Sequence, residues 1–330
     1  MKVAFFSTKS YDKEYFTKFN TEDTHELTFF DVPLNEQTAV LTVGFEAICV
    51  FVNDIINRKT IEIISKNGVK LIALRCAGFN NVDLKAAHKN QIKVVRVPAY
   101  SPESVAEHAA ALILTLNRKT HKAYNRVREG NFSIENLTGF NLFGKTVGVI
   151  GTGLIGAAFC KIMLGFGCEV LAYDVRKSDG LVEKGVVYKS LEDILKESEI
   201  ISLHCPLTRE TAHLIDTTAI SKMKEGVMII NTSRGALINA KDAVEGLKNG
   251  KIGYLGIDVY EQEADLFFQD LSESVIQDDV IARLISFPNV LITGHLGFFT
   301  KEALEEIATI TLNNLSSFEE DREVMNEVKN

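Results

Sequence analysis

Short apolar segments alternate with amphipathic ones over the first 97 residues of the chain. Segments rich in Val, Ile, Leu, Phe and Ala predict buried strands at residues 2–7, 26–31, 47–52, 71–75 and 93–97. The segments between them have helical spacing and predict helices at residues 11–19, 36–43, 60–67 and 83–89. This alternation of strand and helix indicates a parallel sheet with helices on both faces.

A second alternating series begins at Thr146. It predicts strands at residues 147–150, 169–173, 199–204, 227–231, 254–259 and 290–293, and helices at residues 154–167 and 241–248. The pair Asn249 and Gly250 is a typical stop at the carboxyl end of the second of these helices. We therefore predict an α/β protein with two doubly wound, Rossmann-like parallel sheets.

Residues 97–102 interrupt the first series with Val-Pro-Ala-Tyr-Ser-Pro. Ser101 is a suitable cap for a helix beginning at Pro102, and we expect that helix to run to about Arg128 as a bridge between domains.

A last helix is expected after Thr300. If it packs on the first series, one domain comprises residues 1–100 and 299–330, and residues 101–298 form an inserted domain. We expect ligands in a cleft between these domains, and residues 319–330 as a frayed, highly charged tail or a subunit contact.

Composition narrows the class of protein. The net charge of −8 argues against nucleic acid or an anionic membrane surface as a partner. No segment reaches the roughly 20 apolar residues of a transmembrane helix, and the amino terminus has the pattern of a strand instead of a signal peptide. The five cysteines are scattered without metal-ligand spacing, so we predict a reduced, cytoplasmic setting and no metal site.

The segment Gly-Thr-Gly-Leu-Ile-Gly at residues 151–156 joins a predicted strand to a predicted helix. Gly151 permits a tight turn, Gly153 lets a pyrophosphate approach the backbone, and Gly156 lets the helix press against the strand. The helix amino terminus favours phosphate, and Asp174 stands where a carboxylate accepts hydrogen bonds from ribose hydroxyls. A 2′-phosphate would meet like charge there, so we predict NAD as the cofactor in preference to NADP.

Polar residues that suit acid–base chemistry follow the later strands of the second series. Arg234 is a bidentate donor suited to a carboxylate, and His295 can carry a proton near neutral pH. Either Glu263 or Glu261 could orient the imidazole and favour its charged form. Asp258 is expected on the nicotinamide ribose side. Together they could bind a substrate carboxylate, polarise the adjacent carbonyl and supply a proton to a developing alkoxide.

At this point the chain resembles the D-2-hydroxyacid dehydrogenase family, and its lactate-type members most closely. The likeness covers nearly the whole chain and is carried by residues 75–83, 97–102, 105–108, 151–156, 204–208, 231–235, 258–263, 265–268 and 293–295. It implies a flavodoxin-like substrate domain and reversible, NADH-dependent reduction of pyruvate to D-lactate. It also implies that Arg234 binds substrate, that His295 is the acid/base, and that Glu263, not Glu261, supports it.

The resemblance assigns further contacts. The backbone amides of Ala77 and Gly78 would hold the substrate carboxylate, and Tyr100 and Phe298 would line a pocket for its methyl group. The positions matching the family's cofactor contacts are Ile155, Gly156, Asp174, Cys205, Pro206, Thr211, Thr232, Ser233 and Asp258. The partner would be a small-molecule substrate, and the assembly a homodimer or homotetramer. His108 and His121, in the long helix, are interpreted as structural.

Two departures from the family pattern stand near the site. Lactate-type relatives commonly have Gln-Ala where this chain has Leu296 and Gly297, a change expected to loosen the pocket wall or hinge. Thr211 replaces a frequent Asn, which weakens the case for a cofactor contact there. Two alternatives remain: a dehydrogenase for a larger 2-oxo acid such as phenylpyruvate or hydroxypyruvate, and an NAD(H)-sensing corepressor built on the same fold.

Overall fold

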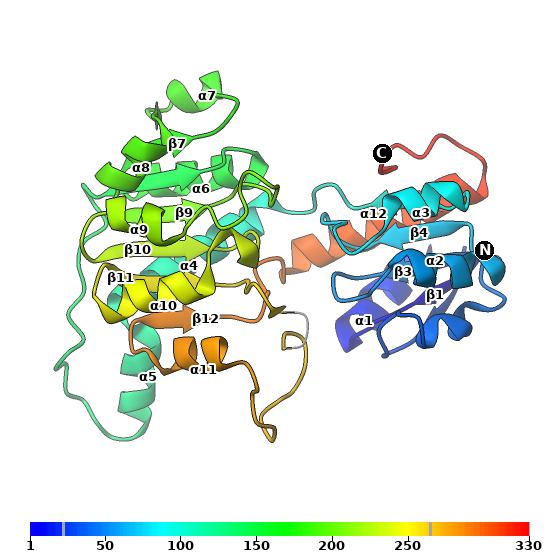
Figure 1. Ribbon diagram of the computed structural model, residues 1–330, viewed down its shortest axis with the longest axis horizontal. Helices are drawn as coiled ribbons and strands as arrows, with labels where there is room; N and C mark the ends of the chain where they lie inside the picture. Colours follow the sequence, from blue (N-terminus) through cyan, green and yellow to red (C-terminus); the bar gives the residue numbers. More distant parts are fainter. Residues whose placement is uncertain (22–23, 264–265, 330) are drawn as a thin grey trace. The chain divides into compact units, whose positions relative to one another are not determined.

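The structure is a computed structural model that describes residues 1–21, 24–263 and 266–329. The chain divides into two compact units. Unit 1 comprises Met1–Ser101 and Phe299–Asn330, and unit 2 comprises Pro102–Phe298. Each unit is built on a parallel β-sheet, with five strands in unit 1 and seven in unit 2, so the predicted fold class is confirmed (Figure 1).

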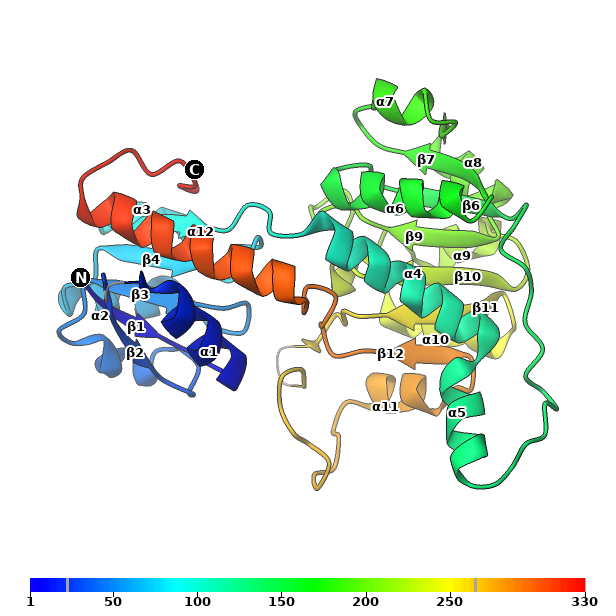
Figure 2. The same cartoon turned by 180° about the vertical axis from the view of Figure 1, so that it is seen from behind.

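The sheet of unit 1 has the strand order β2-β1-β3-β4-β5. Its strands are β1 (Lys2–Phe5), β2 (Glu26–Phe29), β3 (Ala47–Val50), β4 (Leu71–Leu74) and β5 (Lys93–Arg96). Every residue of β3 and β4 is buried, because helices cover both faces of the sheet. In Figures 1 and 2, α2 (Arg58–Lys66) and α3 (Leu84–Lys89) cover one face, and α1 (Ser10–Phe19) and α12 (Lys301–Glu319) cover the other.

Helix α12 returns the end of the chain to unit 1. Thr300 caps it, since its hydroxyl oxygen accepts a hydrogen bond from the backbone nitrogen of Ala303 at 3.3 Å. Ala303, Ile307 and Ala308 are buried where the helix packs on α1 and on strands β4 and β5.

The sheet of unit 2 has the strand order β12-β11-β10-β9-β6-β7-β8. Its strands are β6 (Thr146–Ile150), β7 (Glu169–Tyr173), β8 (Val187–Tyr188), β9 (Ile200–Leu203), β10 (Val227–Asn231), β11 (Ile252–Ile257) and β12 (Val290–Ile292). The order reverses between the neighbours β6 and β9. Open α/β sheets bind ligands at such a switch point, outside the carboxyl ends of the strands.

Helices on both faces of this sheet enclose two separate cores. Successive strand residues face opposite sides: Ile229 packs in one core, and its neighbours Met228 and Ile230 pack in the other. Figure 2 shows α4 (Pro102–Arg118) and α6 (Leu154–Gly165) together on one face. The other face carries α8 (Leu191–Glu197), α9 (Thr217–Lys222), α10 (Ala240–Lys248) and α11 (Asp279–Ser286). Helices α5 (Thr120–Arg128) and α7 (Asp179–Val182) complete the unit.

Two helix predictions were wrong in extent. The helix expected from Pro102 to Arg128 breaks at Lys119, which has a left-handed φ of +51°. The Lys119 ammonium there donates to the carbonyl oxygens of Asn136 and Thr138, at 2.9 and 3.1 Å. The helix expected at 36–43 is only a 3-10 turn, η2 (Thr38–Thr42), in a segment rich in β-branched residues that disfavour a longer helix.

The expectation of a frayed tail is also wrong for part of residues 319–330. Val324 is buried, and Glu327 pairs in antiparallel fashion with Val95 of β5. The backbone nitrogen of Val328 donates to the carbonyl oxygen of Val94 at 2.8 Å. The sequence did not indicate this contact because pairing at the edge of a sheet uses backbone groups, which leave no pattern of side chains in the sequence.

Candidate active site

The turn between β6 and α6 requires glycine at positions 151 and 156. Gly151 has a φ of +94°, and a Cβ there would lie 2.6 Å from the backbone nitrogen of Cys205. A Cβ on Gly156 would lie 1.9 Å from the carbonyl oxygen of Gly151, so the helix presses directly on the turn. At Gly153, which precedes the first residue of α6, a Cβ would meet nothing within 4 Å. An open approach to a helix amino terminus fits the pyrophosphate of a dinucleotide.

Asp174, directly after β7, is bonded to this same turn. Its Oδ2 accepts a hydrogen bond from the backbone nitrogen of Thr152 at 2.6 Å, and its Oδ1 accepts one from the backbone nitrogen of Arg176 at 3.0 Å. Burial alone would raise the pKa of Asp174, but these hydrogen bonds hold it below its usual value. A charged carboxylate therefore stands beside the turn, where a 2′-phosphate would be repelled. Ile155, at the start of α6, is half-buried against the core.

The loops after β9 and β10 are tied together at the predicted cofactor positions. The Ser233 hydroxyl donates to the carbonyl oxygen of Cys205 at 2.8 Å and so joins the two loops. Within the loop after β9, the Thr211 hydroxyl donates to the carbonyl oxygen of Pro206 at 2.7 Å. The buried Thr232 hydroxyl has no hydrogen-bond partner among the described residues, which leaves it for a bound molecule. Burial raises the pKa of the Cys205 thiol to about 11, which suits a wall residue and not a nucleophile.

The structure brings His295 and Glu263 together. The distance between His295 Nδ1 and Glu263 Oε1 is 2.8 Å, and both side chains are about one-fifth exposed. The second carboxylate oxygen of Glu263 accepts a hydrogen bond from the backbone nitrogen of Tyr260 at 2.9 Å, which fixes its orientation. Because a carboxylate only accepts, Nδ1 carries the hydrogen, and Nε2 is the nitrogen that does not face Glu263.

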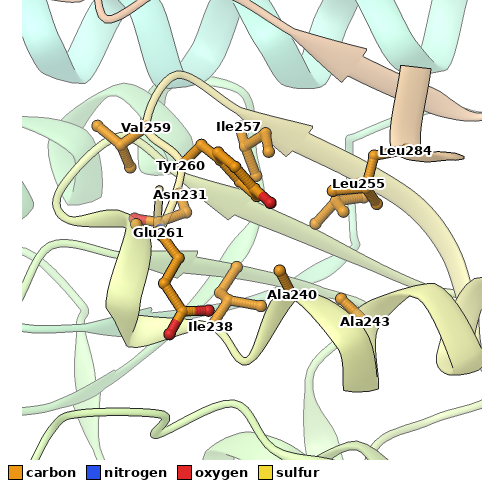
Figure 3. Close-up of a pocket in the computed structure, with 11 residues that line it drawn as sticks. Asn231, Ile238, Ala240, Ala243, Leu255, Ile257, Val259, Tyr260, Glu261 and Leu284 are labelled. Carbon is orange, nitrogen blue, oxygen red and sulfur yellow. The ribbon is translucent and has the colours of Figure 1, made fainter. Parts of the chain in front are cut away.

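Glu261 points to a different histidine. Its Oε1 lies 2.6 Å from Nε2 of His213, in the loop after β9. Figure 3 shows Glu261 and Tyr260 lining a small pocket beside α10, together with Ile238 and Ala240. The geometry thus pairs Glu263, and not Glu261, with His295.

Arg234 lies in the loop after β10, next to the loop that carries Glu263. Gly235 makes this approach possible, since a Cβ there would lie 2.0 Å from the carbonyl carbon of Tyr260. The buried Asn231 side chain donates to the carbonyl oxygen of Arg234 at 2.8 Å. The guanidinium is half-buried and donates from Nη1 to the carbonyl oxygen of Ser233 at 2.6 Å. Arg234, Glu263 and His295 follow the adjacent parallel strands β10, β11 and β12, so all three occupy one edge of the sheet.

Asp258 holds the segment that carries His295. Its carbonyl oxygen accepts the backbone N–H of His295 at 2.8 Å. Its carboxylate oxygens accept the backbone N–H groups of Leu296 and Gly297, at 2.9 and 2.8 Å. Gly297 was expected to loosen this wall, but within unit 2 it is buried and bonded to Asp258. A contact between Asp258 and cofactor stays a prediction.

The expected substrate residues of unit 1 form a structured turn. The backbone nitrogens of Ala77 and Gly78 donate no hydrogen bond within the part of the chain that the structure describes. The carbonyl oxygen of Ala77 accepts from Arg96 Nη1 at 2.8 Å, so the turn is fixed from behind. Two available amides on a fixed turn suit an anion. Tyr100 is half-buried in unit 1.

Of the other site residues in unit 2, Phe298 is buried. His204 lies beneath the glycine turn, with its Nε2 2.8 Å from the Ser202 hydroxyl oxygen. Burial lowers the pKa of His204 to about 3, so its imidazole is neutral at physiological pH and holds no mobile proton. Asp265, within the resemblance, lies outside the described residues.

His108, interpreted from the sequence as structural, makes contacts that the sequence did not indicate. Its Nε2 lies 3.0 Å from the Thr293 hydroxyl oxygen and 3.3 Å from Asp258 Oδ1. The available signal was its place in residues 105–108, one of the segments that carry the resemblance.

Within residues 1–21, 24–263 and 266–329, no three His, Cys, Asp or Glu side chains are grouped to hold a metal ion. No helix in this described part of the chain is both long and apolar enough to cross a membrane.

Known proteins resemble this chain over nearly its whole length. The family model "D-isomer specific 2-hydroxyacid dehydrogenase, NAD binding domain" matches residues 110–297. D-lactate dehydrogenase of Escherichia coli (strain K12) is 56% identical over 328 residues, which cover 99% of this chain and 100% of that protein. Its apo-structure has a TM-score of 0.92 at 53% identity, and 100% of each chain is covered.

Two further solved structures resemble the chain. The pyruvate reductase of Chlamydomonas reinhardtii has a TM-score of 0.94 at 44% identity, and 99% of this chain and 98% of that chain are covered. D-Lactate dehydrogenase from Aquifex aeolicus, complexed with NAD and lactic acid, has a TM-score of 0.86 at 36% identity, with 97% and 96% covered.

Proposed function

Because the chain belongs to the D-isomer specific 2-hydroxyacid dehydrogenase family and contains its NAD-binding domain, we propose that it interconverts pyruvate and D-lactate. The relatives named D-lactate dehydrogenase and pyruvate reductase support this choice of substrate. The observation that carries the proposal is the 2.8 Å contact of His295 Nδ1 with Glu263 Oε1, on loops adjacent to that of Arg234.

In the proposed reaction, His295 is the proton donor for reduction. Its Nδ1–H is held by Glu263, so the proton transferred to the developing alkoxide comes from Nε2. The Glu263 carboxylate stabilises the positive imidazolium before transfer. When bound, NADH supplies the hydride that reduces the keto carbon. In the reverse direction, neutral His295 takes the proton from the hydroxyl of D-lactate.

Arg234 is proposed to bind the substrate carboxylate and to polarise the adjacent carbonyl. A guanidinium offers two parallel N–H groups that match a carboxylate, and the half-buried position strengthens this interaction relative to water. The amides of Ala77 and Gly78 are proposed as further donors to that carboxylate. Tyr100 and Phe298 are proposed to surround the methyl group, which would disfavour larger 2-oxo acids.

A panel of 2-oxo acids tests this proposal. Pyruvate, hydroxypyruvate and phenylpyruvate are compared by kcat/KM, with NADH and with NADPH, and the product is analysed on a chiral column. We expect the highest kcat/KM with pyruvate and NADH, and D-lactate as product. A higher kcat/KM for phenylpyruvate or hydroxypyruvate would support the alternative of a larger substrate. Binding of NADH with no turnover of any acid would point to a sensor.

Replacing Glu263 should slow the reaction. Glu263→Gln keeps the shape of the side chain but replaces the charged acceptor of the His295 Nδ1–H with a neutral amide, so kcat for pyruvate reduction should fall about tenfold. Glu261→Gln is the matched control, because Glu261 contacts His213 instead, and its kcat should equal that of the parent enzyme. Equal kcat for all three proteins would contradict the role of Glu263.

We also propose a homodimer or homotetramer. Large apolar side chains are at least half exposed on α5 and in the segment after it, namely Tyr124, Val127, Phe132, Ile134 and Phe143. Exposed apolar side chains in such number commonly mark subunit interfaces. Light scattering should give at least twice the mass of the chain, and a monomer at micromolar concentration would contradict the proposal.

A cytoplasmic location is supported by the buried free thiols of all five cysteines.

A further inference from the structure

A chain of hydrogen bonds links helix α4 to the segment that carries His295. His108, on α4, lies with its Nε2 3.0 Å from the Thr293 hydroxyl oxygen. That hydroxyl donates to Asp258 Oδ1, at an oxygen–oxygen distance of 2.5 Å. The side chains of His108 and Asp258 are 15% and 2% exposed, so these bonds are largely shielded from water.

The direction of each bond follows from the chemistry of the groups. A threonine hydroxyl has one hydrogen, and that of Thr293 is directed to Asp258. The same oxygen can therefore only accept from His108, so Nε2 of His108 must carry a hydrogen. The hydrogen bonds therefore all point the same way: the imidazole donates to the hydroxyl, and the hydroxyl donates to the carboxylate.

Asp258 connects this series of hydrogen bonds to His295. Three consecutive backbone N–H groups, of His295, Leu296 and Gly297, donate to its carbonyl and carboxylate oxygens. His295 has a φ of +55°, a left-handed conformation that costs energy for a histidine. Such a conformation persists only where the surroundings fix it, and Asp258 supplies the bonds that do so.

Asp258 needs its donors in order to remain a carboxylate. Burial raises the pKa of this side chain, but the His108 imidazole, whose Nε2 lies 3.3 Å from Oδ1, and the hydrogen bond from Thr293 hold it below its usual value. Removal of one donor from a buried carboxylate leaves a charge that is incompletely compensated. Asp258 would then accept other donors or a proton, and its bonds to residues 296 and 297 would weaken.

We propose that His108 is a positioning residue for His295, acting through Thr293 and Asp258; its effect on catalysis rests on the proposed function of His295. His108 touches neither substrate nor cofactor in this role. It fixes the conformation of residues 295–297 and so keeps the His295 imidazole at the Glu263 carboxylate.

The test uses paired substitutions in the full-length enzyme. His108→Leu removes the donor, whereas His108→Gln keeps an N–H close to the position of Nε2. Thr293→Val removes the hydroxyl with little change of shape, and Thr293→Ser retains it. His88→Leu, at an exposed histidine of α3 in unit 1, is the matched control.

The first measurement is the split between kcat and KM. His108→Leu and Thr293→Val should each lower kcat for pyruvate reduction about tenfold, as expected for loss of a hydrogen bond to a charged group. KM for pyruvate and the Kd for NADH should change less than about threefold, since the binding groups are retained. His108→Gln and Thr293→Ser should recover most of kcat. The double variant should be little slower than either single variant, because both changes break one chain.

The second measurement follows His295 without relying on activity. The imidazole proton on Nδ1, hydrogen-bonded to Glu263, should give a downfield NMR signal that disappears in His295→Asn. We expect this signal to be lost or broadened in His108→Leu and Thr293→Val, and to be kept in His108→Gln and His88→Leu.

The two measurements separate the inference from the proposed function. An unchanged His295 signal and unchanged kcat in His108→Leu would overturn the positioning role. Loss of the signal with full kcat would support the positioning role and overturn His295 as the acid. Equal losses of kcat in His108→Leu and His108→Gln, with an intact signal, would also overturn the inference.

Discussion

His295→Asn is expected to lower kcat for pyruvate reduction by at least about 100-fold, the loss typical of a missing general acid. Asn is the suitable replacement because it adopts the left-handed backbone conformation of this position, φ +55°, more readily than most residues. The segment should therefore keep its bonds to Asp258 while the ionisable group is lost. Single-turnover oxidation of enzyme-bound NADH measures the chemical step directly.

Two further measurements make this prediction specific. With deuterated NADH, the isotope effect on kcat should increase in His295→Asn, because the chemical step becomes slower than product release. His88→Asn, at an exposed histidine of unit 1, should leave kcat within about twofold of the parent enzyme. Turnover by His295→Asn within tenfold of the parent enzyme would contradict the assignment of the acid.

Arg234→Gln is expected to lower kcat/KM for pyruvate about 1,000-fold. Two charge-assisted hydrogen bonds to a carboxylate, at about 1.5–3 kcal/mol each, correspond to a loss of this order. Arg234→Lys keeps the charge but not the planar pair of donors, so its kcat/KM should lie between those of Gln and the parent enzyme. Steady-state kinetics over a range of pyruvate concentrations measure both variants.

The control for Arg234 is the binding of cofactor. Fluorescence titration with NADH should give a Kd within about threefold of the parent value for both variants, because the proposed partner of Arg234 is the substrate. Arg283→Gln, at an exposed arginine on α11, should change neither kcat/KM for pyruvate nor the Kd for NADH. Equal kcat/KM for Arg234→Gln and the parent enzyme would rule out Arg234 as the substrate clamp.

The sequence predicted those parts of the fold that side chains encode. Strands such as β10 (Val227–Asn231) are continuous apolar segments, and the carboxyl-terminal stop of α10 is marked by Asn249 and Gly250. The break at Lys119 was missed because no glycine or proline marks it. The partners of the Lys119 side chain there, the carbonyl oxygens of residues 136 and 138, lie 17 and 19 positions away in the sequence. Tertiary contacts of this kind override local propensity.

The sequence likewise predicted only some features of the candidate site. The glycine turn and Asp174 were found because their spacing has a local physical reason. The residues alone could not choose between Glu261 and Glu263, since the two side chains are separated by one position; the structure separates them by their partners, His213 and His295. The bond from His108 to Thr293 spans 185 positions, and no pattern within one helix indicates it.

The antiparallel pairing of Glu327 with Val95 has a practical consequence. Strand β5 is the last strand of its sheet, and an uncovered outer strand offers its backbone groups to strands of other molecules. Glu327, paired with Val95, therefore occupies a position on β5 where a strand of another molecule could otherwise pair and lead to aggregation. Expression vectors that trim this end, or that force a fused peptide into its place, would make the enzyme harder to purify even though every group proposed to take part in the chemistry lies elsewhere.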